Sequence, residues 1–269
     1  MTDHAPRWID HAGLRLHYVL HGSGATAAVL IHELGGSIAS WDAVAAGLER
    51  SLRVLRYDQR GHGDSDAVRT PYGLGDHVGD LGAVLDHVAL VRPCWLIAAA
   101  AGAAIAVEFT ARYPARVAGI VMCAPALDID PARRGYLRDR ADAAARHGMT
   151  AIAESSLEQS WPAMLRCDMP AFEHYRGRLI ASDPVSYALA NRALSDIDLS
   201  AVLPSVHCPC LFLAGEHDLQ RPPPRVAAQA ALVRRASFEV IPRAGHLMAL
   251  QQPARVIARA AAFITGTGE

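Results

Sequence analysis

The sequence predicts an α/β fold built on a mostly parallel, eight-stranded sheet, and the order of its apolar patterns carries that prediction. Short apolar runs alternate with amphipathic helical patterns along most of the chain. Parallel strands need crossover connections, whose helices cover both faces of the sheet. The alternation breaks once, because the pattern between residues 127 and 203 is helical throughout. We therefore expect an α/β core formed by residues 1–126 and 204–269, with residues 127–203 inserted as a helical cap.

Each strand is expected where an apolar run is bounded by turn residues. The expected strands are 8–10, 14–20, 27–32, 52–57, 94–98, 118–123, 210–214 and 238–241. The first two are separated only by a turn at 11–13, so they should form an antiparallel hairpin at one edge. Helices are expected in the core at 38–50, 74–90, 102–113, 225–233 and 253–264, and in the cap at 131–147, 151–161, 170–181 and 184–194.

Length and charge limit the classes of partner. With 269 residues, of which 51% are hydrophobic, the chain can bury a large core as one domain with an insertion. Lys and Arg total 26 against 27 for Asp and Glu, so no net field attracts nucleic acid or an anionic membrane. A small-molecule substrate is expected, with no cofactor, and with the chain acting as a monomer or a homodimer.

The cysteines and the N-terminal residues predict the cellular compartment of the protein. The five cysteines are odd in number and lie in apolar surroundings, which indicates reduced thiols in a cytoplasmic protein. The first ten residues lack the basic start and apolar run of a signal peptide, and no stretch has the roughly 18 uncharged apolar residues of a membrane span. The segment 207–210 has metal-ligand residue types but no second ligand pair at suitable spacing, so no metal site is expected.

In an open α/β sheet, ligands bind outside the carboxyl ends of the strands, so the residues after each strand are the candidates for a site. After the strand at 27–32, His32 and Glu33 precede Leu34 and a glycine pair at 35–36. Paired glycines free the backbone to turn and to present N–H groups, as an oxyanion hole requires. Taken by itself, this segment is better explained as an ordinary glycine-rich turn between a strand and a helix.

The strand at 94–98 enters its helix through an alanine-rich turn at 98–102. A sharp strand-to-helix turn that exposes a nucleophile needs small residues two positions on either side of its centre. Ala98 and Gly102 meet that need and place Ala100 at the exposed centre. The alternative for this segment is an ordinary junction between a strand and a helix.

Two later strand ends carry an acid and a base. Asp218 closes the turn G-E-H-D after the strand at 210–214, and His246 follows Gly245 after the last strand. A carboxylate that orients a histidine makes that histidine an effective general base. The alternatives are an aspartate in a surface turn and a histidine on a loop.

Together these motifs resemble the α/β-hydrolase fold superfamily, in which nucleophile, acid and histidine follow one another in this chain order. The turn Y-D-Q-R-G-H-G-D-S at 57–65 resembles the superfamily's D-x-R-G-x-G-x-S turn, which is mainly structural, so His62 is expected to be a turn histidine. The resemblance covers nearly the whole chain. The short N-terminal hairpin and this turn look closest to 3-oxoadipate enol-lactonase and related ester, lactone and C–C hydrolases.

The resemblance implies a role for each candidate residue. His246 would be the general base and Asp218 the group that orients it. The backbone N–H groups of Leu34 and Ala101 would stabilise an oxyanion. The side chains expected to contact the substrate are His32, Trp41 and Trp161.

Two residues depart from the pattern of the superfamily. Ala100 stands at the nucleophile position, and a methyl group cannot attack a carbonyl, so an acyl-enzyme formed at this position is excluded. Glu33 stands where the resembling enzymes usually have glycine. It is a candidate for a second acid or base, and the alternative is a side chain turned to solvent or to an arginine such as Arg60.

Three explanations of Ala100 stay open. The first is an enzyme, hydrolase-like or an unusual lyase, in which His246 activates water or moves a proton on a small ester, lactone or β-dicarbonyl compound. The second is an engineered substrate trap in which Ala100 replaces a serine, and the third is a non-catalytic binder of small ligands. Glu33 favours the first, because an engineered substitution would leave it unexplained. The cap arginines are expected mostly on solvated helix faces, with an anionic substrate as the alternative.

Overall fold

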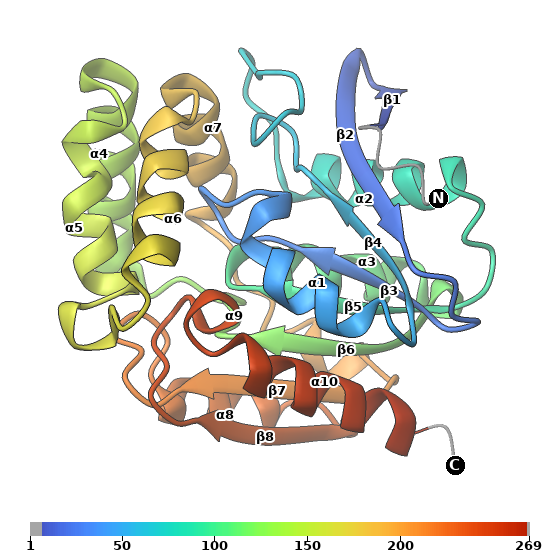
Figure 1. Cartoon of the computed structure of the whole chain (residues 1–269). Helices are drawn as coiled ribbons and strands as arrows, with labels where there is room; N and C mark the ends of the chain where they lie inside the picture. Colours follow the sequence, from blue (N-terminus) through green and yellow to red (C-terminus); the bar gives the residue numbers. More distant parts are fainter. Residues whose placement is uncertain (1–6, 268–269) are drawn as a thin grey trace.

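The computed structural model describes residues 7–267, and its eight-stranded sheet confirms the predicted α/β fold (Figure 1). The strands are β1 (Arg7–His11), β2 (Leu14–His21), β3 (Ala27–Ile31), β4 (Arg53–Tyr57), β5 (Cys94–Ala99), β6 (Val117–Cys123), β7 (Cys210–Gly215) and β8 (Ala236–Ile241). Their order across the sheet is β1-β2-β4-β3-β5-β6-β7-β8. β2 is antiparallel to both β1 and β4, and the remaining neighbours are parallel.

The central strands are apolar along their whole length because helices cover both of their faces. Every residue of β3, β5 and β7 is buried. The edge strand β8, by contrast, leaves most of its residues exposed or half-buried. Unbroken apolar runs, rather than alternating ones, are therefore the sequence signal of the strands that support the site.

Helices pack on both faces of the sheet (Figure 1). The core helices are α1 (Asp42–Leu48), α2 (Leu74–His87), α3 (Ala101–Arg112), α8 (Pro223–Ala230), α9 (Met248–Gln251) and α10 (Pro253–Gly266). On one face α2, α3 and α8 bury Leu81, Phe109 and Val226 against the strands. On the other face α1 and α10 bury Val44 and Val256. These two hydrophobic cores hold the carboxyl ends of the strands in fixed positions.

The insertion between β6 and β7 is helical, as expected. It forms α4 (Pro131–His147), α5 (Thr150–Ser160), α6 (Met169–Ala181) and α7 (Pro184–Leu194), which lie on the side to which the arrowheads of β6 and β7 point (Figure 1). These helices share a hydrophobic cluster of their own, and Leu247 from the core joins it. The boundaries of the cap at residues 127 and 203 stay a prediction.

Local backbone geometry explains where the expected helices differ from the observed ones. The expected helix 38–50 begins as a 3-10 turn, Ile38–Trp41, and the Ser37 hydroxyl accepts a hydrogen bond from the N–H of Ala39 (3.3 Å). α2 ends before residue 90 because Ala89 has φ of +53°, which an α-helix cannot include. The short helix α9 was not expected. Within residues 7–267, no helix is both long and apolar enough to cross a membrane.

Candidate active site

The turn between β5 and α3 has the strained geometry that an exposed nucleophile position requires. Ala100 lies at its centre with φ +45° and ψ −112°, a conformation that residues with a side chain rarely adopt. Two backbone hydrogen bonds hold it there: Ala100 N–H donates to the carbonyl of Cys123 (2.9 Å), and Ala126 N–H donates to the carbonyl of Ala100 (3.0 Å). The elbow geometry is therefore present although the nucleophile is not.

Small neighbours make this turn possible. A Cβ atom on Gly102 would lie 2.6 Å from the backbone oxygens of both Ile31 and His32, so only glycine fits there. Ala98 is fully buried beneath the turn. The spacing of small residues around Ala100 thus has a steric cause, which is the close approach of α3 to the end of β3.

The acid and the base meet beside this turn. His246 Nδ1 lies 3.0 Å from Asp218 Oδ2, although the two residues follow different strands. The other carboxylate oxygen of Asp218 accepts hydrogen bonds from the N–H groups of Gln220 (2.8 Å) and Arg221 (2.9 Å). Burial opposes ionisation, but the charge of His246 and these hydrogen bonds outweigh it and hold the pKa of Asp218 below its ordinary value. Asp218 is therefore a fixed carboxylate that can orient the imidazole and stabilise its protonated form.

Glu33 points inward, not to solvent. Its side chain is buried, Ser40 Oγ donates a hydrogen bond to Glu33 Oε1 (2.7 Å), and Tyr175 from the cap lies beside its carboxylate. Arg60 is bonded to Asp80 instead. Burial is the largest influence and raises the pKa of Glu33, so its carboxyl group keeps its proton to a higher pH than an ordinary glutamic acid.

A cavity of about 110 Å³ connects these groups between the core and the cap. Five of the residues expected from the sequence line it: Glu33, Leu34, Ala100, Ala101 and His246. Asp218 lies behind His246 as its hydrogen-bond partner. The cavity thus brings the Glu33 carboxyl group and the His246 imidazole together beside the centre of the elbow.

Two backbone N–H groups at this cavity are free to act as donors. Ala101 begins α3, so its N–H has no acceptor within the helix. The N–H of Leu34 donates to no group in the described part of the chain. Both residues line the cavity, as a pair of oxyanion donors must.

The structure does not place the three expected substrate contacts in the cavity, and this corrects the expectation. Trp41 is buried in the core under the sheet, and Trp161 fills the cap core, where its Nε1 donates to the carbonyl of Leu165 (3.0 Å). His32 is fully buried, and its Nε2 accepts a hydrogen bond from Gln59 N–H (3.0 Å). The imidazole of His32 therefore carries its proton on Nδ1, which donates to the carbonyl of Glu33 (2.8 Å).

Burial also fixes the charge state of His32. It lowers the pKa of His32 to about 3, so the ring is neutral at physiological pH. A neutral ring with both nitrogens bonded to backbone groups supports the loop that carries Glu33 and Leu34. Its role is to position that loop, and it does not touch the cavity.

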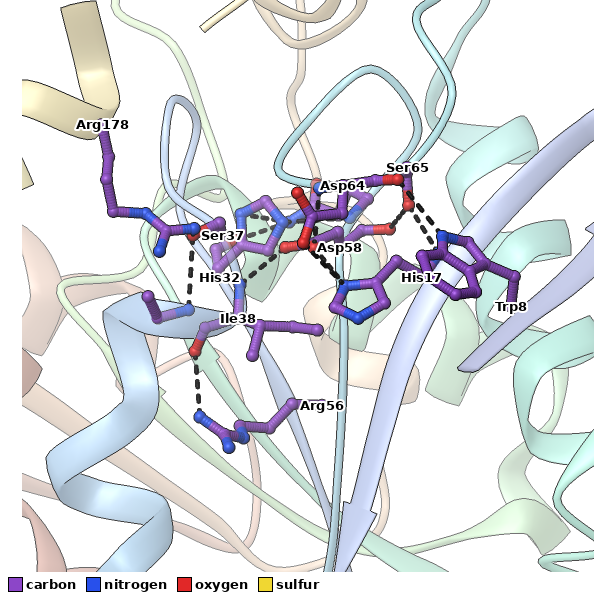
Figure 2. A network of polar contacts seen from close by, with 12 residues as sticks. Trp8, His17, His32, Ser37, Ile38, Arg56, Asp58, Asp64, Ser65 and Arg178 are labelled. Atoms are coloured by element: carbon purple, nitrogen blue, oxygen red, sulfur yellow. Dashed lines mark hydrogen bonds and ion pairs between the residues drawn. The ribbon is translucent and has the colours of Figure 1, made fainter. Parts of the chain in front are cut away.

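The turn at 57–65 supports the same loop from the other side (Figure 2). Asp58 accepts hydrogen bonds from the N–H of Ile38 (2.7 Å) and of Asp64 (3.0 Å), and its Oδ2 lies 2.7 Å from His17 Nδ1. His62 is buried, and its Nδ1 lies 3.1 Å from the backbone oxygen of Arg60. These contacts are structural, which agrees with the expectation for the turn and for His62.

Cap residues complete the cavity, and the sequence did not single them out for it. They include the polar side chains Arg140, Ser156, Ser160, Tyr175 and Asn191. None belongs to a motif, and the face that a cap helix turns to the core depends on how the cap docks. Arg140 was one of several cap arginines for which an anionic substrate was the alternative.

Comparisons with known proteins agree with this geometry. Residues 24–252 match the sequence model of a hydrolase family described as serine aminopeptidase, S33 (Hydrolase_4). The 3-oxoadipate enol-lactonase 2 of Acinetobacter baylyi is 25% identical over 246 residues, which cover 88% of each chain. RutD of Variovorax paradoxus is 40% identical over 110 residues, 40% of this chain and 41% of its own, so this match spans less than half of that relative.

Solved structures of hydrolases also resemble this chain over almost its whole length. An esterase from Thermogutta terrifontis has a TM-score of 0.91 at 26% identity, covering 97% of this chain and 98% of its own. The enol-lactonase from Burkholderia xenovorans LB400 has a TM-score of 0.91 at 26% identity, covering 96% of this chain and 100% of its own. The resemblance to enol-lactonases and related hydrolases is confirmed. The chain is a hydrolase-like enzyme that belongs to the serine aminopeptidase S33 family on the α/β-hydrolase fold.

Proposed function

We propose that this protein hydrolyses a small ester, lactone or β-dicarbonyl compound by activating water directly, without an acyl-enzyme. The observation that carries the proposal is the His246–Asp218 pair, bonded at 3.0 Å, with its imidazole on the same cavity as Ala100. A methyl group at the elbow leaves water as the nucleophile that a base in this position can activate.

The proposed reaction on an ester begins with proton transfer from water to His246. The water oxygen attacks the carbonyl carbon, and the resulting oxyanion accepts hydrogen bonds from the N–H groups of Leu34 and Ala101. The bond to the leaving oxygen then breaks, and that oxygen takes a proton from Glu33. The proton held by His246 returns to Glu33 through water, which restores both groups for the next turnover.

Glu33 suits the role of the acid in this scheme. It lines the cavity together with His246, and burial favours its protonated form. Ser40 holds its carboxyl group in place by donating to Oε1 (2.7 Å), so the proton has a defined position on the other oxygen. A general acid that holds its proton to a higher pH than an ordinary carboxyl group suits a poor leaving group.

The substitution Ala100→Ser tests whether the site works without a nucleophile. We expect the unaltered protein to hydrolyse at least one member of a panel of esters, lactones and 1,3-diketones, and we expect Ala100→Ser to raise kcat by less than about threefold, because water already fills the role of the nucleophile. Steady-state kinetics on both proteins measures this. Ala126→Ser is the matched control, since it adds a hydroxyl to the same cavity at a residue that is hydrogen-bonded to the elbow but is not its centre.

Other outcomes would contradict the proposal. The chain would be a serine hydrolase that lacks its nucleophile if kcat rises by about 10³-fold or more in Ala100→Ser, or if only this variant shows turnover. The intact elbow at Ala100 is the observation that favours this second candidate. Ligand binding without turnover in either protein would identify a binding protein.

The substitution Glu33→Gln removes the proposed acid while keeping the size of the side chain. We expect kcat to fall by about 10²-fold. The rate of the unaltered protein should also fall as pH rises through the raised pKa of Glu33, because the acid is then lost, and Glu33→Gln should lack this alkaline limb. A pH series of kcat on both proteins measures the effect. The exposed Glu216→Gln is the control, and an unchanged alkaline limb in Glu33→Gln would remove Glu33 from the mechanism.

A further inference from the structure

The cap end of the cavity carries a buried donor without an acceptor. Asn191 on α7 is 1% exposed and lines the cavity, and its Nδ2 has no hydrogen-bond partner within residues 7–267. A buried amide N–H group without an acceptor is costly, so its retention indicates an acceptor that arrives from outside the chain. The cavity is the space from which that acceptor can reach Asn191.

Arg140 on α4 adds a positive charge at the same end. It lines the cavity, its buried Nε has no hydrogen-bond partner, and within the described residues it forms no ion pair. Its guanidinium lies over the ring of Tyr187, 5.5 Å from the centroid. Tyr187 and Asn191 are one turn apart on α7, so the stacking brings Arg140 to the part of α7 that carries the free amide.

The neighbouring arginines show that this arrangement is particular to Arg140. Arg138, two residues earlier on α4, points outward and pairs with Asp196 at 3.0 Å. Arg221, the other arginine of the cavity, lies 3.6 Å from the carboxylate of Asp128, which it shares with Arg225, and donates to the Asp128 carbonyl (2.8 Å). Glu33 is the acidic residue of the lining, and its hydrogen bond is to Ser40 and not to Arg140. The charge of Arg140 therefore lacks a counterion in the described part of the chain.

We infer that Arg140 and Asn191 form a carboxylate-binding site, and that the substrate is a small carbonyl compound that carries a carboxylate. The cavity of about 110 Å³ is smaller than the engineered cavity of about 150 Å³ that holds benzene, so its ligand is a small molecule. The carboxylate lies at the cap end, where Arg140 and Asn191 donate to it, and the carbonyl lies at Ala100 and the two N–H donors. The identity of the substrate rests on the proposed function, whereas carboxylate binding does not.

Isothermal titration calorimetry with a ligand pair tests the site without any turnover. Levulinate carries a ketone and a carboxylate, and levulinamide has the same shape with a neutral amide in place of the carboxylate. We expect the unaltered protein to bind levulinate at least about tenfold more tightly than levulinamide, because charge-assisted hydrogen bonds are the stronger ones. Arg140→Met should remove this preference, and Arg138→Met, on the same helix, should keep it.

The outcomes separate this inference from the proposed hydrolysis. Equal affinities for the two ligands, or no measurable binding of levulinate, would overturn the carboxylate site even if esters are hydrolysed. A preference for levulinate that depends on Arg140 would establish the site even if no substrate turns over. If Arg140→Met does not fold, as judged by circular dichroism, the comparison of the two ligands on the unaltered protein still decides.

Discussion

Replacing His246 by alanine is expected to lower kcat/KM by about 10² to 10⁴-fold on any substrate that the protein hydrolyses, which is the usual contribution of a positioned general base. The reason is geometric: His246 reaches the cavity, and its Nδ1 is fixed by Asp218. Without the imidazole, water at Ala100 has no base to accept its proton. Steady-state kinetics on the most reactive ester or lactone of the panel measures the loss.

His217→Ala is the matched control for this substitution. His217 lies in the turn one residue before Asp218, is half-buried and does not line the cavity, so its loss should leave the rate unchanged. Asp218→Asn should also lower kcat, because the amide cannot stabilise a protonated imidazole. If His246→Ala turns over every accepted substrate at the original rate, His246 is not the base.

Removing Asp80 is expected to produce the largest loss of stability. The carboxylate of Asp80 is fully buried on α2 and binds Arg60 through two hydrogen bonds, from Nε at 2.6 Å and from an η nitrogen at 2.7 Å. Asp80→Ala leaves the buried guanidinium with only the longer contacts to Asp76, at 3.3 Å to its carbonyl and 3.7 Å to its carboxylate, and we expect the free energy of unfolding to fall by about 3–5 kcal/mol. Denaturant unfolding followed by circular dichroism measures this.

An exposed ion pair on the same helix supplies the control. Asp86 on α2 pairs with Arg116 at 2.8 Å, but its side chain is 71% exposed. Asp86→Ala should cost less than about 1 kcal/mol, because water already screens an exposed pair. If Asp80→Ala and Asp86→Ala lower the free energy of unfolding equally, burial of the Arg60–Asp80 pair does not determine how much that pair stabilises the fold.

The fold and the catalytic end of the site could be predicted from the sequence because both depend on local patterns. The cap helices Pro131–His147 and Pro184–Leu194 have the expected bounds, since each follows an aspartate that caps it and begins at a proline. Asp218 and His246 were found because polar residues after parallel strands gather at one edge of the sheet. These signals need no knowledge of how distant segments pack.

The other end of the cavity could not be predicted because it depends on packing. Trp161 was expected at the substrate, yet its large ring fills the interior of the cap, where burial of an aromatic side chain is most favourable. Tyr175 and Asn191 belong to helices whose orientation over the core is not written in any short motif. Their roles depend on which face α6 and α7 turn toward the elbow.

Tyr175 of the cap lies beside Glu33 of the core, so the position of the cap bears on the pKa of Glu33. Tyr175 lies on α6, which also bonds to the core through Arg178 and the hydroxyl of Ser37. Any displacement of α6 that admits water to Glu33 removes the burial that raises its pKa, and the carboxyl group then releases its proton. In the proposed mechanism the acid would therefore work only while α6 covers Glu33, because the same helix keeps solvent from this carboxyl group and so keeps it protonated.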